Sequence, residues 1–531
     1  MRYFRICCVA TTIATLAPSI AASQQKKLAT YYSPDTVQNI HLQVKSEHLQ
    51  KMKDALPKRI YVPGSFRWRD ITITNVAVRY KGNSSSRPNQ RHKRSFLIRF
   101  DKFKKGTRFL GLRRVSFDNG VQFGSLFSEP IVTEILRAEK IKTHRANHAR
   151  VFLNKKFHGV YVNVERIDQS FIQHHLDDSG GSLFKVDLGG PGANLQFIGK
   201  NPEAYRRTFE PKSKSASHDL GRLVEFIRVI NQMSSKEAEK RLTSNLELDD
   251  FLRTTAVMLF AGAFDQLTGW NPHNYYLFFD HKRKRWRYLP WDLDVGFSDN
   301  AFGRIRVIDE WNAAWPVTGG PPNPLLEKII GNPELIKRYR RIASRILEEH
   351  FKPEILGKRL DAKFALIKDD LAKDPFPHRR ATNPRDRDFA GIIVSMKSFF
   401  QKRYQTARKQ LNEPGKRLMI VRRQRRPRRQ PSPGPASKNA PTGLKVVIKD
   451  GRIQLSWKDN AKSEVAYIVQ RASKTGPFRN HIGQPGDNIT NATDRRTGRG
   501  ETYRYRVYAV CRTLSGPKAT GPSNIVTLRI P

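Results

Sequence analysis

Residues 265–294 read DQLTGWNPHNYYLFFDHKRKRWRYLPWDLD, and this segment decides how the chain folds around its candidate site. Residues 275–279 and 286–290 have the alternating pattern of two strands, and the polar segment 280–284 between them is highly charged. This spacing predicts a strand hairpin with a charged turn. The residues just before the first strand and just after the second are therefore expected to meet at the open end of the hairpin.

Carboxylate and amide side chains flank that open end. Asn274 precedes the first strand, Asp292 and Asp294 follow the second, and Asp265 lies nine positions before Asn274. Mg²⁺ prefers hard oxygen ligands and is usually held by one or two carboxylates together with substrate phosphates, so Asn274 and Asp292 are candidate ligands. Asp265 is then a candidate base for a substrate hydroxyl. Because acidic residues at strand ends are often only structural, the spacing alone leaves a loop cap, a turn and arginine ion pairs equally open.

Five segments occur in the order seen in the CotH (spore-coat protein H) kinase family, and over roughly residues 39–411 the chain resembles that family. They are VRYKGNSSSR (78–87), NKKFHGVYVNVERID (154–168), GSLFK (181–185), HNYYLF (273–278) and PWDLD (290–294). The resemblance implies an atypical protein-kinase-like domain with two lobes. It also implies an enzyme that transfers the γ-phosphate of ATP to Ser or Thr of exported or surface proteins.

The resemblance gives roles to the residues around the hairpin. Asp265 is expected to accept the proton of the substrate hydroxyl, Asn274 to hold a metal, and Asp292 to chelate Mg²⁺ or Mn²⁺, with Asp294 as a further ligand. One feature departs from protein kinases, whose catalytic loop places the Asp and the Asn five positions apart. The nine positions here make residues 269–272 an apparent insertion. Asn271 therefore competes with Asn274 as the metal ligand, and the base assignment stays open.

A glycine followed by serines is the candidate phosphate-covering loop. Gly82 lies between two strand-like segments and is followed by Ser84 and Ser85. A residue without Cβ lets the backbone bend closely around phosphate, and hydroxyls and amides can then donate hydrogen bonds. The segment matches neither GxxxxGK nor a full GxGxxG, so without the resemblance it reads as an ordinary turn.

Basic residues for the phosphates come from two segments. Lys93 precedes the alternating segment 95–100, and the resemblance makes it the candidate contact for the α- or β-phosphate. In protein kinases this lysine pairs with a glutamate, for which Glu165 is the candidate. Glu165 follows a strand instead of lying within a helix, so a cap or a surface pair with Arg166 competes with that role. Lys185, in GSLFK, is the other expected phosphate contact.

The termini and the composition point to export. Residues 1–23 carry two early arginines, an apolar run and small residues, the pattern of a cleaved signal peptide. The apolar run is shorter than a bilayer span and no later segment qualifies, so no transmembrane anchor is expected. Beyond the predicted cleavage point only Cys511 remains, which permits no internal disulfide. A secreted or cell-surface location, periplasmic or extracellular, follows as the expectation.

The chain is strongly basic, with 97 Lys and Arg against 48 Asp and Glu and a formal charge of +49. Such an excess attracts polyanions through fields that salt weakens. Nucleic acid is an unlikely partner, since no helix-turn-helix, zinc-finger or RNA-recognition signature is present. Anionic cell-surface polymers and protein substrates fit export better, and a purely solubilising role for the charge remains open.

The patterns predict an α+β chain with distinct parts. Residues 37–412 begin with strand-rich segments and continue with helical ones, as a kinase-like domain requires. Residues 413–440 are a Pro/Arg-rich linker, because the run RRQRRPRRQPSPGP cannot bury a core. Residues 441–531 read as an all-β sandwich that resembles a fibronectin type III domain, with Trp457 in its core and Tyr503 at a tyrosine corner.

Three functions fit these observations. The first is a secreted, ATP- and Mg²⁺-dependent protein kinase. The second is a non-catalytic surface or adhesion protein that keeps the same scaffold, since a fold alone does not establish catalysis. The third, which ranks below both, is nucleic-acid binding driven by charge.

Overall fold

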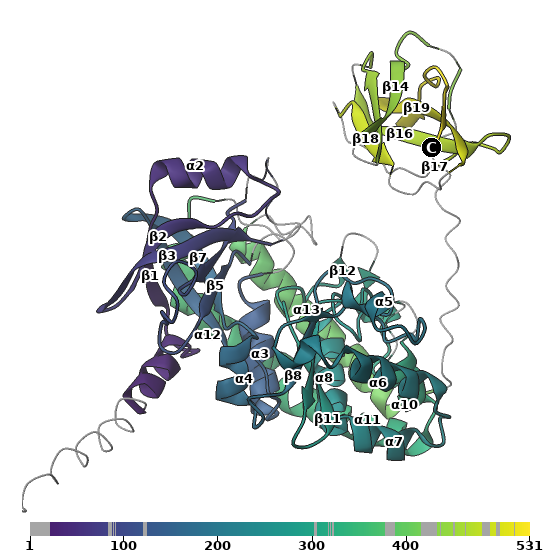
Figure 1. The fold of residues 1–531 in the computed structure, drawn as a ribbon. Coiled ribbons are helices and arrows are strands. Elements are labelled where there is room, and N and C mark those ends of the chain that lie inside the picture. Colours follow the sequence, from purple (N-terminus) through teal and green to yellow (C-terminus); the bar gives the residue numbers. More distant parts are fainter. Residues whose placement is uncertain are drawn as a thin grey trace, which may run out of the picture. The chain divides into compact units, whose positions relative to one another are not determined.

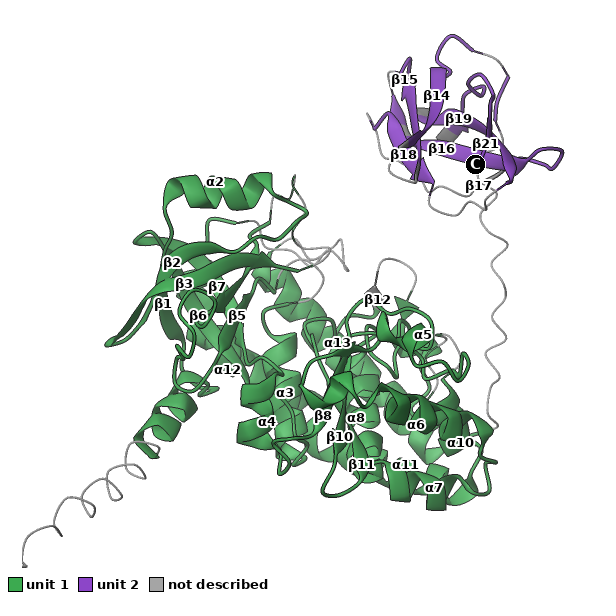
Figure 2. Ribbon diagram, viewed as in Figure 1, with its two compact units in different colours: residues 1–419 green, residues 420–531 purple. Residues whose placement is uncertain are grey.

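A computed structural model describes residues 22–82, 86, 88, 90, 92–120, 125–301, 305–316, 318, 320, 323–376, 388–415, 433–435, 437–449, 452–461, 463–480, 489–494, 500–513 and 516–531. The chain divides into two compact units, Met1–Met419 and Ile420–Pro531 (Figure 2). The predicted signal sequence up to residue 21 and most of the predicted linker lie outside the described residues, as do Ser84 and Ser85.

Unit 1 begins with a closed β-barrel. Its strands follow the order β1-β2-β3-β4-β5-β7-β6, and a parallel pairing of β1 with β6 closes the ring. A closed ring has no free strand edge left to pair with another chain. The strands are β1 (Gln38–Gln43), β2 (Val62–Trp68), β3 (Ile71–Lys81), β4 (Ser95–Arg99), β5 (Arg114–Asp118), β6 (Ala146–Leu153) and β7 (Lys156–Val164), and α2 (Ser46–Asp54) lies beside β2 (Figure 1).

Side chains of β3 alternate between the barrel core and the outer face of the barrel, so the same strand can also line a site outside the barrel. Val76, Val78 and Tyr80 point into the barrel core. Side chains of a strand alternate between its two faces, so Arg79 and Lys81 point outward. The outer face of this strand is therefore free to line a pocket.

The rest of unit 1 is mainly helical and surrounds a small antiparallel sheet with the order β11-β10-β8-β9 (Figure 1). The sheet strands are β8 (Ser182–Val186), β9 (Glu210–Pro211), β10 (Tyr275–Asp280) and β11 (Arg285–Pro290), with a separate pair β12 (Asn300–Ala301) and β13 (Ile305–Arg306). The helices are α3 (Ser128–Ala138), α4 (Gln169–His175), α5 (Glu203–Arg206), α6 (Leu220–Gln232), α7 (Ala238–Asn245), α8 (Leu248–Ala261), α9 (Val307–Glu310), α10 (Pro324–Ile330), α11 (Pro333–His350), α12 (Pro353–Leu371) and α13 (Phe389–Asn412), and Ser215–Ser217 form a 3₁₀ turn.

Helix starts in this part follow local chemistry. Helices α10 and α11 open with proline, and the side chains of Asn323 and Asn332 accept hydrogen bonds from the first-turn amides. Proline suits the first helical position because its missing N–H has no partner there in any case. The predicted mixed α+β class is confirmed. Among the described residues, no helix is both long enough and apolar enough to cross a bilayer.

The hairpin predicted from residues 265–294 is confirmed. Strand β10 pairs antiparallel with β11, with Tyr275 opposite Pro290 and Asp280 opposite Arg285. The Asp280 carboxylate accepts the amides of Lys282 and Arg283 and so closes the charged turn. At the other end, the amide of Trp291 donates to the carbonyl of Asn274 at 3.0 Å.

Unit 2 is all-β. One sheet has the order β14-β15-β18, and β17-β16-β19-β20 form another, to which β21 adds by pairing with β19. Trp457 lies in the shared core with Tyr467 and Tyr505, as predicted, and Cys511 packs at its edge as a free thiol. Arg471 lies over the Tyr503 ring. The strands are β14 (Thr442–Lys449), β15 (Arg452–Lys458), β16 (Glu464–Ser473), β17 (Arg479–Asn480), β18 (Asn491–Asp494), β19 (Thr502–Thr513), β20 (Gly516–Ala519) and β21 (Val526–Arg529).

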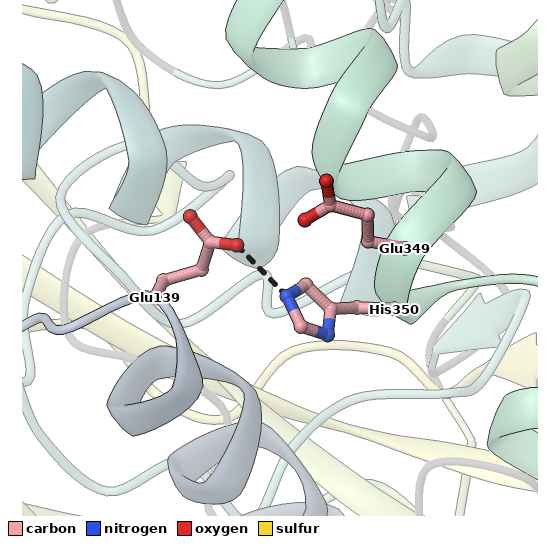
Figure 3. Close-up of side chains that lie close together, drawn as sticks. All are labelled: Glu139, Glu349 and His350. Atoms are coloured by element: carbon pink, nitrogen blue, oxygen red, sulfur yellow. Dashed lines mark hydrogen bonds and ion pairs between the residues drawn. The ribbon is translucent and has the colours of Figure 1, made fainter.

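A cluster of charged side chains joins the end of α3 to the end of α11 (Figure 3). Glu139, Glu349 and His350 lie close enough to hold a cation. However, Arg345 donates to Glu139 at 2.9 Å and also to Glu349, and His350 lies 2.8 Å from Glu139. The guanidinium already supplies the positive charge, so the cluster is an ion-pair network between two helices.

This network predicts an acid-sensitive contribution to stability. Burial alone would raise the pKa of Glu139, but hydrogen bonds from His350 and Arg345 lower it to about 2 from its usual 4.5. Its contribution is therefore complete above about pH 4.5 and is lost as the pH falls toward 2. We expect Glu139→Gln to cost about 1.5–3 kcal/mol near neutral pH, and this difference from wild type to shrink below pH 4.5 in urea unfolding of the full chain. Glu349→Gln, which alters an exposed carboxylate, is the control, and an equal pH dependence in both variants would contradict the assignment.

Candidate functional site

One polar pocket of about 320 Å³ lies between the barrel and the helical part of unit 1. The barrel contributes the outward-facing residues of β3, β4 and β5, and the helical part contributes the open end of the β10–β11 hairpin. The lining residues are Arg59, Arg79, Lys81, Gly82, Ser95, Leu97, Asp118, Asn119, Arg166, Lys185, Asp187, Leu188, Asp265, His273, Asn274, Trp291, Asp292, Asp294 and Val295. The pocket therefore combines a group of carboxylates with a group of cations.

The carboxylates gather at the hairpin end. Burial raises the pKa of Asp292, and Asp118 adds to this while Lys81 opposes it. Burial also raises the pKa of Asp294 well above its usual value, reinforced by Asp292 and Glu129. Carboxylates so close together disfavour one another's charge. A cation placed among them would relieve this repulsion.

The backbone around the hairpin end is in an uncommon conformation. Asn274 has φ of 54° and Asp292 has φ of 61°, and both line the pocket. Positive φ is sparsely populated by non-glycine residues, although Asn and Asp tolerate it best. Such residues tend to cluster at functional sites, where surrounding contacts hold them in place. The two predicted ligands, Asn274 and Asp292, thus share a positive-φ backbone conformation and line the same pocket.

Asp265 lies on the same pocket with two oriented contacts. Its Oδ1 accepts a hydrogen bond from Nδ2 of Asn271 at 3.1 Å, and its Oδ2 lies 3.2 Å from Nε2 of His273. Burial alone would lower the pKa of His273, but the contact with Asp265 raises it. Asn274 lines the pocket and Asn271 does not. The geometry therefore favours Asn274 over Asn271 as a ligand and gives Asn271 the task of orienting Asp265.

Glu129, which the sequence analysis did not single out, supports the segment that bears the carboxylates. It lies in the first turn of α3. Its Oε1 is 2.9 Å from Nε2 of His144 and 3.4 Å from the amide of Leu293, the residue between Asp292 and Asp294. Its Oε2 is buried and has no hydrogen-bond partner among the described residues. No local pattern marks this glutamate, because its partners come from other elements.

The prediction that Lys93 contacts phosphate is wrong. Its ammonium is fully buried and donates to the carbonyl of Val160 and, at 2.6 Å, to Asp374. It also lies over the Tyr161 ring, a residue of the barrel core. Lys93 precedes β4, so the alternation that places Leu97 on the pocket side does not extend to it. Its side chain contacts β7 and Asp374 instead of the pocket.

Lys81 takes the position on the pocket that the sequence analysis assigned to Lys93. It is the last residue of β3, its ammonium is ion-paired with Asp118, and it lies 3.8 Å from Oδ1 of Asp292. The alternation of Val76, Val78 and Tyr80 was the signal that could have identified it. Asp118 also accepts a hydrogen bond from Oγ of Ser116 at 2.8 Å, which fixes the pair on the barrel wall.

The predicted pairing of Glu165 with Lys93 is also wrong. Arg145 donates two hydrogen bonds to the Glu165 carboxylate, from Nε at 2.8 Å and from Nη2 at 2.6 Å. Nε2 of His175 lies 3.0 Å from Oε1 of the same carboxylate. Burial alone would raise the pKa of Glu165, but the hydrogen bonds from His175 and Arg145 hold it well below its usual value. Glu165 does not line the pocket and is a buried structural anion.

The remaining predicted residues divide between the pocket and the part of the chain that is not described. Gly82 lines the pocket with φ of 104°, a conformation that favours glycine. Lys185 lines it too, ion-paired with Asp187. Ser84 and Ser85 lie outside the described residues.

The residues on the pocket suit a divalent cation bound with a phosphate chain. Asn274, Asp292 and Asp294 offer oxygen donors, the type that Mg²⁺ and Mn²⁺ prefer. Lys81, Lys185 and Arg166 offer positive charge beside these donors, around the ring of Trp291. A site with both groups can bind a metal–phosphate complex and place a hydroxyl near Asp265.

Curated relatives of this chain are spore coat proteins. Inner spore coat protein H of Bacillus subtilis is 23% identical over 287 residues, which are 54% of this chain and 75% of that protein. Spore coat protein homolog 1 of Rhizopus delemar is 22% identical over 256 residues, 46% of this chain and 40% of that protein.

Similar solved structures each match less than a fifth of the chain. They include a Fn3-like protein from Clostridium thermocellum (TM-score 0.15, 29% identity, 18% of this chain and 96% of that one) and an FN3 domain of human collagen XX (TM-score 0.16, 17% identity, 19% and 100%). At these TM-scores neither likeness bears on the fold, and the fibronectin type III assignment of unit 2 stays a prediction.

The family comparison covers the part of unit 1 that builds the pocket. The family described as CotH kinase protein matches residues 78–407. This range includes Lys81 on the barrel, the β10–β11 hairpin, and the pocket carboxylates of Asp265, Asp292 and Asp294. Since the match spans more than half of the chain, the protein belongs to the CotH kinase protein family.

Proposed function

We propose that this protein is an ATP-dependent protein kinase that transfers the γ-phosphate of ATP to Ser or Thr hydroxyls of exported or surface proteins. The observation that carries the proposal is the meeting of Asp265, Asn274 and Asp292 with Lys81 on one pocket. A β-rich part and a helical part border that pocket, and this division supports the two-lobed, kinase-like fold that we propose with the activity. Membership of the CotH kinase protein family supports the same activity.

The pocket residues divide naturally between the metal and the nucleotide. Asn274, Asp292 and Asp294 would hold Mg²⁺ or Mn²⁺, which when bound neutralises charge on the phosphates. Lys81, on the barrel, and Lys185, on β8, would contact the phosphate chain. Gly82 leaves the backbone free to approach the phosphates, because it carries no Cβ.

Asp265 is suited to the proton transfer. Its carboxylate is kept in place by Asn271 and His273. It accepts the proton as the O–H bond of the acceptor breaks and the new O–P bond forms. The bond from the terminal phosphorus to its bridging oxygen breaks, and ADP leaves. Most of the rate enhancement in such a reaction comes from positioning and charge stabilisation.

The location and the partners of the enzyme are parts of the same proposal. The predicted signal sequence and the spore coat names of the two relatives fit a secreted or surface protein. Those names also favour a second candidate, a non-catalytic surface protein on the same scaffold. The charge of +49 suits contact with anionic surface polymers in either case.

Two measurements on the purified full chain test the proposal. Calorimetry with ATP and Mg²⁺ should register binding that depends on the cation. Labelled ATP with casein or the protein itself as acceptor should give phosphoserine or phosphothreonine. A folded protein that neither binds ATP nor transfers phosphate would overturn the proposal and favour the non-catalytic role. Steep salt-dependent binding to duplex DNA without transfer would instead point to nucleic acid.

A further inference from the structure

Three cationic side chains lie over the indole ring of Trp291 on the pocket wall. The guanidinium carbon of Arg166 lies 4.5 Å from the ring centroid, and the ammonium groups of Lys81 and Lys185 lie at 5.5 and 5.9 Å. The ring is only 2% exposed and directly precedes Asp292. An aromatic face attracts a cation through its quadrupole. Trp291 therefore holds three positive charges beside the candidate metal ligands.

These three cations differ in their anionic partners. Lys81 is ion-paired with Asp118, and Lys185 with Asp187. Arg166 forms no hydrogen bond or ion pair with any residue in the described part of the chain, and its buried Nε lacks an acceptor there. An enclosed donor without a partner is costly. Asp118, Asp168 and Asp187 favour its charge from a longer distance, so among the three Arg166 is the cation that has no direct ion-pair partner among the described residues.

The chain segment around Arg166 is rigidly held. Glu165, one residue earlier, is held by hydrogen bonds with Arg145 and His175. Asp168, two residues later, caps α4 and accepts a hydrogen bond from Arg114. Because its neighbours on both sides are anchored, Arg166 is presented to the pocket with little freedom to turn away.

We propose that Arg166, supported on Trp291, is a principal contact for the phosphate chain of the bound nucleotide. This deepens the proposed function and rests on it for the identity of the nucleotide. A guanidinium offers a planar fork that donates two parallel hydrogen bonds to a phosphate. The guanidinium lies over the indole ring, and its Nε has no acceptor in the described part of the chain, so it can still donate to a phosphate. Lys81 and Lys185 add charge, but each shares it with a carboxylate.

Tripolyphosphate without metal is the probe that isolates this contact from the metal ligands. Calorimetry at about 0.15 M salt, which screens long-range attraction, should show that Arg166→Met binds about 10- to 100-fold more weakly than the wild-type chain, the range of a lost charge-assisted hydrogen bond. Arg166→Lys should be intermediate, since it restores a point charge without the fork. The control is Arg150→Met, which removes one positive charge from an ion pair with Asp370 outside the pocket.

The outcomes separate this inference from the proposed function. Wild-type affinity in Arg166→Met, equal weakening in Arg150→Met, or no binding of tripolyphosphate by the wild type would each overturn the role of Arg166. Should Arg166→Met fail to fold, the folded Arg166→Lys variant decides, and wild-type affinity there would also overturn it. Phosphotransfer retained by an Arg166 variant at the wild-type kcat/KM would leave the kinase standing without this contact. Selective loss of tripolyphosphate binding in a protein without phosphotransfer would support the anion site and reject the kinase.

Discussion

Asp292→Asn is expected to lower phosphotransfer by at least about 1000-fold while the protein remains folded. The change keeps the size of the side chain but removes the charge that would hold the divalent cation. Charge stabilisation by a bound metal is worth several kcal/mol in the transition state, and about 4 kcal/mol corresponds to a factor of 1000 in rate. Steady-state rates with labelled ATP at saturating Mg²⁺ measure the effect.

Asp280→Asn is the matched control for this experiment. Asp280 is a buried carboxylate at the opposite end of the same hairpin, where it caps the charged turn. Asn can accept the same backbone hydrogen bonds, so the variant should transfer phosphate at close to the wild-type rate. Equal activity of Asp292→Asn and wild type would contradict the metal-binding role of this end of the hairpin. Equal loss in both variants would indicate a disturbed hairpin instead.

Lys93→Met and Asp374→Asn are each expected to destabilise unit 1 by about 3–5 kcal/mol, the range found when one partner of a buried ion pair is removed. Both side chains are fully buried, and Asp374 also accepts the amide of Val160 at 3.0 Å. Either substitution leaves the other polar group enclosed without its partner. Urea unfolding of the full chain, followed by tryptophan fluorescence, measures the change.

Two comparisons make this prediction specific to the buried pair. The double variant Lys93→Met/Asp374→Asn should lose clearly less than the sum of the single losses, because groups in direct contact are not additive. Arg150→Met breaks a more exposed ion pair with Asp370, and such pairs contribute about 0–1 kcal/mol. Losses of only that size for Lys93→Met would show that Lys93 is not a structural residue and would reopen its assignment to phosphate.

Local pattern was sufficient for the elements that carry the site. The alternation in residues 275–279 and 286–290 identified β10 and β11, and the hairpin necessarily brought Asn274 and Asp292 to one end. This inference works because strand pairing across a short turn depends on residues near each other in the chain. The position of Asp265 near the same end of the hairpin could be predicted in the same way, since it lies only nine residues before Asn274.

The basic side of the pocket was not predictable in the same way. The alternation of β3 places Lys81 on the outer face of the barrel, but no local signal shows that Lys93, just before β4, is buried away from the pocket. Lys93 is buried by Asp374, which lies 281 positions away in the sequence. Glu165 likewise forms hydrogen bonds with Arg145 and His175 away from the pocket, whereas its neighbour Arg166 lines the pocket. Each of these choices depends on a partner contributed by another element.

The sequence by itself determined the α+β class, the β10–β11 hairpin and the oxygen donors at its open end, because periodicity and turn chemistry act over a few residues. Only the tertiary structure decided which cations face those donors. A buried charge needs a partner, and where that partner lies depends on contacts between distant segments. Asp374, just after α12, therefore holds Lys93 in the core, while Lys81 and Arg166 line the pocket.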